Sequence, residues 1–293
     1  MDYRVLAPGQ RCQVHAAQLD GSTTLLWESS ELLLEAPNWA PDGVALILNG
    51  HGTLWRLDVR SGHLTPITIS GIPTLNNDHV IAPDGETIYL SANDGHIYSA
   101  PLAGGEAVRA THEGPPDLHF LHGVSPDGST LAYVGLEPEG ANLWARANIF
   151  AIPTAGGPDT RLTDTAFPAD GCEYSPDGEW IYFNTEQYGT VAGHAQIARM
   201  RPDGSDAEQL TFDDEVNWFP HLSPDGRTAV YLSFPPGTAG HPADLDVVLK
   251  LVNHDDWRSA KPLVRLFGGQ GTINVNSWSP TSDRFAFVAY PQW

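Results

Sequence analysis

Short runs of apolar and aromatic residues recur along the chain, and each follows a stretch of turn-forming residues. The runs lie at 44–48, 87–90, 131–134, 180–183, 228–232 and 285–289. Runs of this length that are rich in β-branched and aromatic residues and bounded by Gly, Pro and Asp are typical of β-strands. The pattern therefore predicts an all-β chain built from many short strands.

A Pro-Asp-Gly turn precedes five of these runs, and a weaker copy, Ser279-Pro280-Thr281-Ser282, precedes the last. The turn prolines are 42, 43, 50, 48 and 56 residues apart: Pro41, Pro83, Pro126, Pro176, Pro224 and Pro280. In such a turn Pro presets φ, Asp bonds the local backbone and Gly adopts a positive φ. A self-similar period of about 40–50 residues is typical of a β-propeller.

The two ends of the chain hold complementary parts of one repeat. The C-terminal repeat supplies two inner strands, at 272–279 and 284–289, and the N-terminus begins with a hairpin, 13–19 and 23–28, around Asp20-Gly21. Pairing these strands closes a ring and removes its open edges. We therefore predict a single domain, residues 1–293, folded as a six-bladed β-propeller. Its blades are four-stranded and antiparallel, and N-terminal outer strands pair with C-terminal inner strands.

The repeats resemble those of TolB-like six-bladed propellers. The strings NWAPDGVALIL, HGVSPDGSTLAYVG, CEYSPDGEWIYFNT and PHLSPDGRTAVYLS carry the resemblance, which covers nearly the whole chain. A weaker resemblance is to oligogalacturonate-lyase-type propellers. The same repeat occurs in peptidase propeller domains and in non-catalytic scaffolds, so the resemblance implies the fold and leaves the function to the site.

Charge and composition exclude some functions. The chain has 36 acidic and 15 basic residues, a net charge of −21, which repels polyphosphate and argues against a nucleic-acid partner. The sequence contains no run of 18 apolar residues, so it predicts no membrane-spanning helix. The first residues lack a signal pattern, so we expect a cytoplasmic protein, or a periplasmic or secreted one if a signal has been removed. Cys12 and Cys172 are expected to be separate buried thiols.

The long loops of the predicted propeller all lie on one face. Connections between second and third strands are long at 136–147, 186–195 and 234–246, and those between blades are long at 72–78, 113–121 and 213–219. The opposite face carries the tight Pro-Asp-Gly turns. Binding residues tend to lie on loops held by a rigid scaffold, so we expect the main pocket to open on the long-loop face.

Four ligand-type side chains lie on successive inner strands, just before the turn prolines: His79, His122, Glu173 and His221. Imidazole and carboxylate groups together suit a divalent ion, for which Mn²⁺, Zn²⁺, Fe²⁺ and Ca²⁺ are candidates. Asp78 and Asp170 stand nearby as further ligands or supporting groups. The alternative is that these are polar channel residues bonded to water or backbone. His79 and His122 lie one position out of register with the other two, so a bulge is needed to bring all four inward.

The resemblance to oligogalacturonate-lyase-type propellers implies a carbohydrate-active lyase that acts by β-elimination. A hydrolase that acts on carbohydrates is the other enzyme class that we consider. His119 or His241 would then be the catalytic base near neutral pH. The predicted ligand is a small molecule or oligosaccharide on the long-loop face. The alternative function is a non-catalytic scaffold for a protein or peptide partner. Aromatic residues in or beside the long loops suit either sugar rings or blade packing: Phe120, Trp144, Tyr188, Trp218 and Phe219.

Overall fold

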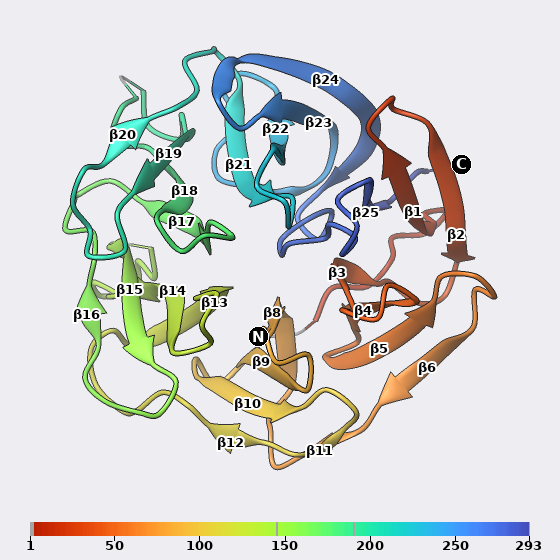
Figure 1. Cartoon of the computed structure of the whole chain (residues 1–293), viewed down its shortest axis with the longest axis horizontal. Helices are drawn as coiled ribbons and strands as arrows, with labels where there is room; N and C mark the ends of the chain where they lie inside the picture. The colour runs from red at the N-terminus through yellow and green to blue at the C-terminus, as the bar shows by residue number, and fades with distance from the viewer. Residues whose placement is uncertain (1–2, 145, 190, 293) are drawn as a thin grey trace.

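Six blades surround a central axis in the computed structural model, which describes residues 3–144, 146–189 and 191–292 (Figure 1). All elements of these residues are strands, so the predicted six-bladed all-β propeller is confirmed. Nowhere in these ranges does the chain form a helix that is long and apolar enough to cross a membrane.

The blades follow one another along the chain. Blade 1 contains β3 (Glu35–Trp39), β4 (Ala45–Gly50), β5 (Thr53–Asp58) and β6 (Leu64–Ile67). Blade 2 contains β8 (Leu75–Ile81), β9 (Thr87–Ala92), β10 (Ile97–Pro101) and β12 (Val108–Arg109). Blade 3 contains β13 (Leu118–Val124), β14 (Thr130–Leu136), β15 (Ala147–Pro153) and β16 (Thr160–Arg161).

The remaining strands complete the ring. Blade 4 contains β17 (Ala169–Tyr174), β18 (Ile181–Thr185), β19 (Gln196–Met200) and β20 (Glu208–Gln209). Blade 5 contains β21 (Val216–Leu222), β22 (Thr228–Phe234), β23 (Ala243–Asn253) and β24 (Asp256–Gly269). Blade 6 contains β1 (Cys12–Gln18), β2 (Thr23–Ser29) and β25 (Arg284–Ala289). Two short strands, β7 (Ile69–Ser70) and β11 (Gly105–Glu106), pair in parallel between blades 1 and 2.

Blade 6 closes the ring in the predicted way. The N-terminal β1 pairs antiparallel with the C-terminal β25, from Gln13 opposite Ala289 to Gln18 opposite Arg284. β2 lies outside β1. Residues 272–279 fill the innermost position, but they form a single bridge to β25 rather than the continuous strand that the sequence predicts.

The core lies between neighbouring blades. Every residue of the second strands β4 and β18 is buried, because each strand packs against a blade on both faces. This double burial explains why the second strands appear in the sequence as continuous apolar runs rather than as alternating patterns. Cys12 and Cys172 are buried free thiols, as predicted.

The Pro-Asp-Gly turns have the predicted geometry. In blade 5, Asp225 Oδ1 accepts hydrogen bonds from Ser223 Oγ (2.7 Å) and the Arg227 backbone N–H (3.1 Å). Gly226 then adopts φ +69°. In the weaker copy, Ser282 adopts the corresponding left-handed conformation, φ +60°, without being glycine. A side chain in this region is strained by its own Cβ.

We expect two substitutions in these turns to change stability in opposite directions. Gly226→Ala should lower the free energy of unfolding by about 1 kcal/mol, because an added Cβ meets no atom within 4 Å and the cost is purely conformational. Ser282→Gly should raise it, by less than about 1 kcal/mol, because the relief of the same strain outweighs the loss of the exposed hydrogen bond that Ser282 Oγ accepts from the Asp225 N–H. Urea unfolding measures both, and shifts of the same sign would contradict this account of the turns.

A β-bulge interrupts the inner strand of five blades. The register between the first and second strands shifts within each of these segments: Glu35/Asn38, Leu75/His79, Leu121/Gly123, Asp170/Glu173 and Trp218/His221. Ala36, Gly171 and Phe219 adopt positive φ at three of them. A bulge bends the strand and redirects its side chains. Residues before and after each bulge therefore point to different parts of the channel.

Candidate functional site at the channel mouth

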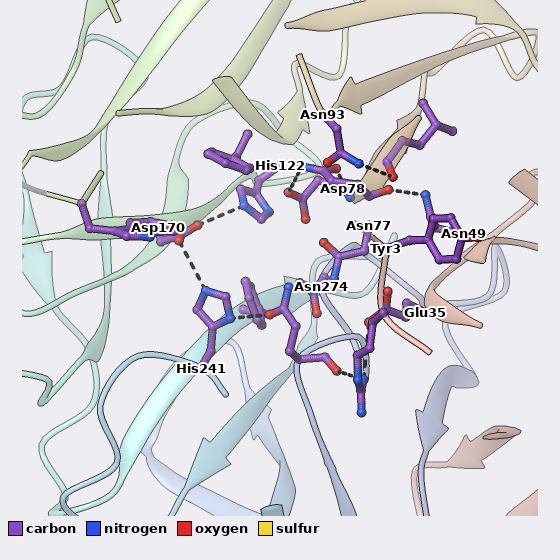
Figure 2. A pocket seen from close by; sticks show the side chains of 17 residues that line it. Tyr3, Glu35, Asn49, Asn77, Asp78, Asn93, His122, Asp170, His241 and Asn274 are labelled. Atoms are coloured by element: carbon purple, nitrogen blue, oxygen red, sulfur yellow. Dashed lines mark hydrogen bonds and ion pairs between the residues drawn. The ribbon is translucent and has the colours of Figure 1, made fainter. Parts of the chain in front are cut away.

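A cavity of about 300 Å³ lies where the inner strands begin, on the face opposite the Pro-Asp-Gly turns. The main pocket was predicted on the long-loop face, and the cavity that buried charged side chains line does open there. A hollow of about 860 Å³ lies on the opposite side between blades 1 and 2, but turn residues line most of it, and no histidine is among its described lining residues. Figure 2 shows the channel-mouth cavity, whose lining includes Arg4, Glu35, Asn49, Asn77, Asp78, His122, Trp144, Asp170, His241, Gln270 and Asn274.

A regular sequence position supplies much of this lining. The residues six positions before the turn prolines are Glu35, Asn77, Phe120, Asp170, Trp218 and Asn274. All of these except Trp218 line the cavity. The predicted ligands come from the third and fourth positions before each proline, which lie within or beyond the bulges. Glu35, Asn77 and Asn274 were therefore not predicted, although the sixth position identifies them.

His122 and Asp170 form the central ion pair of the cavity. His122 Nε2 donates to Asp170 Oδ1 across 3.0 Å, and both side chains are buried. Burial lowers the pKa of His122, but the charges of Asp78 and Asp170 outweigh it and raise that pKa to about 9. Burial would raise the pKa of Asp170, yet the hydrogen bond from His122 holds it below its usual value. His122 is thus a cation and Asp170 an anion at neutral pH.

Asp78 stands beside this pair with one oxygen unused. Its Oδ2 accepts from Asn76 Nδ2 (3.2 Å), whereas its buried Oδ1 has no hydrogen-bond partner within the described part of the chain. Burial, with the charge of Asp170, raises the pKa of Asp78 to about 6. His122 Nδ1 is buried and likewise has no hydrogen-bond partner of ordinary geometry among the described residues, although the Asn274 backbone helps to raise the pKa of His122 and the Asn274 side chain opposes the rise in the pKa of Asp78. The lining of the cavity therefore includes an unsatisfied acceptor on Asp78 and an unsatisfied donor on His122.

His241, one of the two predicted bases, reaches the cavity from the 234–246 loop. Its Nδ1 donates to Gln270 Oε1, and its Nε2 lies 3.9 Å from Asp170 Oδ2. Burial lowers the pKa of His241, so the ring is neutral at pH 7 with Nε2 as an acceptor. The edge-on ring of Trp218, 4.3 Å away between centroids, holds the imidazole in place.

The N-terminal segment crosses the mouth and adds a cation that the sequence did not predict. Arg4 bonds Asp244 (2.7 Å), Glu35 (3.4 Å) and the Gln270 carbonyl (2.9 Å), and its guanidinium lies over the Tyr290 ring. Burial raises the pKa of Glu35 to about 7, although Arg4 opposes the shift.

The four predicted metal ligands do not converge. His221 Nδ1 bonds Glu173 Oε2 (2.6 Å) and its Nε2 bonds the Ile273 carbonyl (2.6 Å), so neither nitrogen is open to a metal. His79 Nε2 bonds the Ile47 carbonyl (3.3 Å), and burial lowers the pKa of His79 to about 4. Of the four predicted ligands, His122 alone is among the residues that line the cavity.

The bulges explain this separation, since the register shift falls between Leu75 and His79 in blade 2 but between Leu121 and Gly123 in blade 3, so equivalent sequence positions face different parts of the channel. In the described ranges, no group of three or more His, Cys, Asp or Glu side chains is arranged to hold a metal ion. His79, His122, Glu173 and His221 therefore do not fit a shared ion. A divalent ion bound elsewhere stays a prediction.

His119, the other predicted base, lies away from the cavity. Its Nδ1 donates to the Gly95 carbonyl (2.7 Å), and its ring packs between His96 and Tyr133. This placement between blades 2 and 3 leaves His119 outside the cavity lining, so it cannot act on a ligand there. Among the predicted aromatic residues, Phe120, Trp144 and Phe219 do line the cavity.

The His122–Asp170 pair should make stability depend on pH. Because the pKa of His122 is about 9 in the folded protein and about 6.5 in the unfolded chain, its contribution is fully present below pH 6.5 and is lost as pH rises through 9. We expect up to about 3 kcal/mol to be lost over that range. Thermal unfolding of the protein and of His122→Asn tests this, because the variant should show a smaller fall in melting temperature. Parallel pH profiles would contradict it.

The comparisons with known proteins agree with the fold. No protein-family model matches the chain. The uncharacterized protein Atu1656 of Agrobacterium fabrum is 40% identical over 272 residues, which cover 91% of this chain and 87% of that protein. A TolB-type structure from Agrobacterium tumefaciens has a TM-score of 0.87 and 36% identity, and the match covers 97% of this chain and 99% of the other.

More distant structures share the fold alone. TolB from Acinetobacter baumannii has a TM-score of 0.66 and 19% identity over 89% of this chain and 65% of its own. Oligogalacturonate lyase in complex with manganese has a TM-score of 0.58 and 14% identity over 88% of this chain and 74% of its own. The identity and coverage of the two Agrobacterium proteins decide the family: this chain belongs to the TolB-like six-bladed β-propellers.

Proposed function

We propose that the channel-mouth cavity binds a small polyhydroxylated ligand, such as one residue of a sugar chain. One observation carries this proposal: Asp78 Oδ1 and His122 Nδ1 are buried, find no hydrogen-bond partner among the described residues, and belong to residues that line the same cavity. Leaving buried polar groups unsatisfied costs about 1–3 kcal/mol each, and a ligand that satisfies both recovers that energy.

Hydroxyl groups suit this pair of atoms. Protonated His122 has already used Nε2 for Asp170, so Nδ1 carries a hydrogen that needs an acceptor. Asp78 Oδ1 needs a donor. A hydroxyl group both accepts and donates, so one hydroxyl, or two on neighbouring carbons, can satisfy both residues.

The rest of the lining fits the same ligand. Side-chain amides from Asn49, Asn77 and Asn274 surround the carboxylates, and they offer donors and acceptors without adding charge. At the rim, the rings of Phe120 and Trp144 stack with centroids 6.0 Å apart, and Trp144 is 46% exposed. A volume of about 300 Å³ lies at the small end of ligand sites, which limits the occupant to about one sugar ring.

Two substitutions test the binding site. Asp78→Ala removes the orphaned acceptor and should weaken binding at least tenfold, equivalent to about 1.4 kcal/mol. Trp144→Ala removes the exposed ring and should weaken it less. Isothermal titration with a panel of neutral and charged di- to tetrasaccharides supplies the measurement. Asp42→Asn, on the Pro-Asp-Gly face, is the control and should bind normally; equal losses in all three variants would place binding elsewhere.

A second candidate function, glycoside hydrolysis, rests on the pKa values of two carboxyl groups that line the same cavity. The pKa of Asp78 is raised and that of Asp170 is lowered, which is the pattern of a proton donor next to an ionised partner. Neutral His241 adds an acceptor beside Asp170. Release of reducing sugar from a bound oligosaccharide tests this, and Asp170→Asn should abolish it. Binding without any such release would leave the cavity a binding site only.

A further inference from the structure

We infer that the ligand carries an amino group next to a hydroxyl, as an amino sugar does, and that Asp78 receives the ammonium. This inference rests on the proposed function and specifies the chemistry of its ligand. It follows from the balance of charges around the cavity, from the polar groups near Asp78 and from the aromatic side chains at the entrance of the cavity.

Carboxylates outnumber cations in this part of the channel. Glu35, Asp170 and Asp244 each lie against one of the two cations: Arg4 bonds Glu35 and Asp244, and His122 bonds Asp170. Asp78 is the fourth carboxyl group. With two cations against four carboxyl groups, an anionic ligand such as a uronate meets net repulsion. A ligand cation offsets the excess negative charge.

The surroundings of Asp78 suit an ammonium. An ammonium has three hydrogens to donate, and Asp78 Oδ1 accepts one. Asn49 and Asn77 line the same cavity; the Nδ2 of Asn49 is used by the Asn76 carbonyl, which leaves its Oδ1 as an acceptor. His122 Nδ1 on the other side still needs an acceptor, which a neighbouring hydroxyl oxygen supplies. Asp78 Oδ1 therefore suits an ammonium group, and His122 Nδ1 suits a hydroxyl oxygen. An amino sugar carries these two groups on adjacent carbons.

The entrance favours a cation as well. Tyr3 and Trp144 line the mouth, and each is 46% exposed, so part of each ring stays accessible although His51 stacks on Tyr3 and Phe120 stacks on Trp144. Aromatic faces attract ammonium groups by about 0.5–1 kcal/mol at exposed sites. The net charge of −21 adds a long-range attraction for cations.

Burial gives the binding event a measurable signature. It raises the pKa of Asp78 to about 6 and that of Glu35 to about 7, so both carboxyl groups are partly protonated near pH 6. An ammonium beside them favours the ionised forms and lowers these pKa values. Binding of an amine at pH 6 should therefore release more protons to the buffer than binding of an uncharged sugar, whose hydroxyl only donates a hydrogen bond to the carboxylate.

The experiment compares glucosamine oligosaccharides with their N-acetylated counterparts of the same length. Titration calorimetry at pH 6, in two buffers of different ionisation enthalpy, measures affinity and proton release together. We expect the amine to bind at least tenfold more tightly, with proton release. Asp78→Asn keeps an acceptor but removes the charge, so it should reduce the preference for the amine over the N-acetylated sugar from at least tenfold to less than about threefold.

The outcomes separate the two proposals. If the N-acetylated sugar binds as tightly as the amine, the inference is overturned and the proposed polyhydroxyl site stands. If neither sugar, nor any other in the panel, binds, the proposed function itself is overturned. Circular dichroism of Asp78→Asn shows whether the variant is folded, and the comparison of the two sugars on the unaltered protein needs no variant at all.

Discussion

Deletion of residues 1–29 is expected to abolish the folded, soluble protein rather than to shorten it. β1 supplies the pairing partner for β25 from Arg284 to Ala289, and the fully buried Cys12, Val14 and Ala17 of β1 belong to the packing of blade 6. Without them the ring stays open, and β25 presents an unpaired edge that favours aggregation. The loss should be on the order of 5 kcal/mol or more, comparable to the whole stability of many domains.

Size-exclusion chromatography and far-ultraviolet circular dichroism measure this outcome. The matched control deletes residues 1–5 only, which removes Arg4 from the cavity but leaves β1 and β2 in place. The control should fold and elute as the parent does. A monomeric, cooperatively unfolding protein that lacks residues 1–29 would contradict the closure described here.

Disruption of the Glu173–His221 pair should be the most destabilising single change. Glu173 in blade 4 accepts hydrogen bonds from His221 Nδ1 (2.6 Å), the Leu222 N–H (3.0 Å) and Asn276 Nδ2 (2.7 Å). It thereby joins blades 4, 5 and 6 near the axis. Because removal of one partner of a buried pair leaves the other unsatisfied, we expect His221→Ala to cost about 3–5 kcal/mol.

Urea denaturation of His221→Ala, Glu173→Gln and the double variant measures this interaction. The double variant should lose less than the sum of the two single losses, because the residues contact each other. Glu179→Gln alters an exposed carboxylate that pairs with Arg201 and should leave the unfolding midpoint unchanged. Additive losses, or a loss for Glu179→Gln as large as for Glu173→Gln, would contradict the role assigned to the pair.

The fold could be predicted from the sequence because its signals are local. Pro, Asp and Gly fix each turn by their own conformational preferences, as Asp225 and Gly226 show, and the repeat spacing then determines the blade count. The closure of the ring could be predicted because the C-terminal repeat has only two strands and the N-terminal hairpin supplies two more. None of these inferences depended on the register of an inner strand.

The positions of the site residues depend on the register of the inner strands, and the sequence alone did not predict that register. His79 and His122 both lie four residues before a turn proline, yet His79 bonds the Ile47 carbonyl while His122 reaches Asp170. A bulge leaves no clear mark in a single sequence when its left-handed residue is Ala36 or Phe219 rather than Gly. Arg4 could not be predicted either, because its partners lie 31 and 240 residues away.

The central claim is that the channel-mouth cavity is the ligand site, and a crystal structure with a glucosamine disaccharide at saturating concentration tests it most directly. The account predicts density for one sugar ring in the cavity, with its amino and hydroxyl groups within hydrogen-bond distance of Asp78 Oδ1 and His122 Nδ1. Density for the sugar on the Pro-Asp-Gly face, with only water between Asp78 and Trp144, would contradict it.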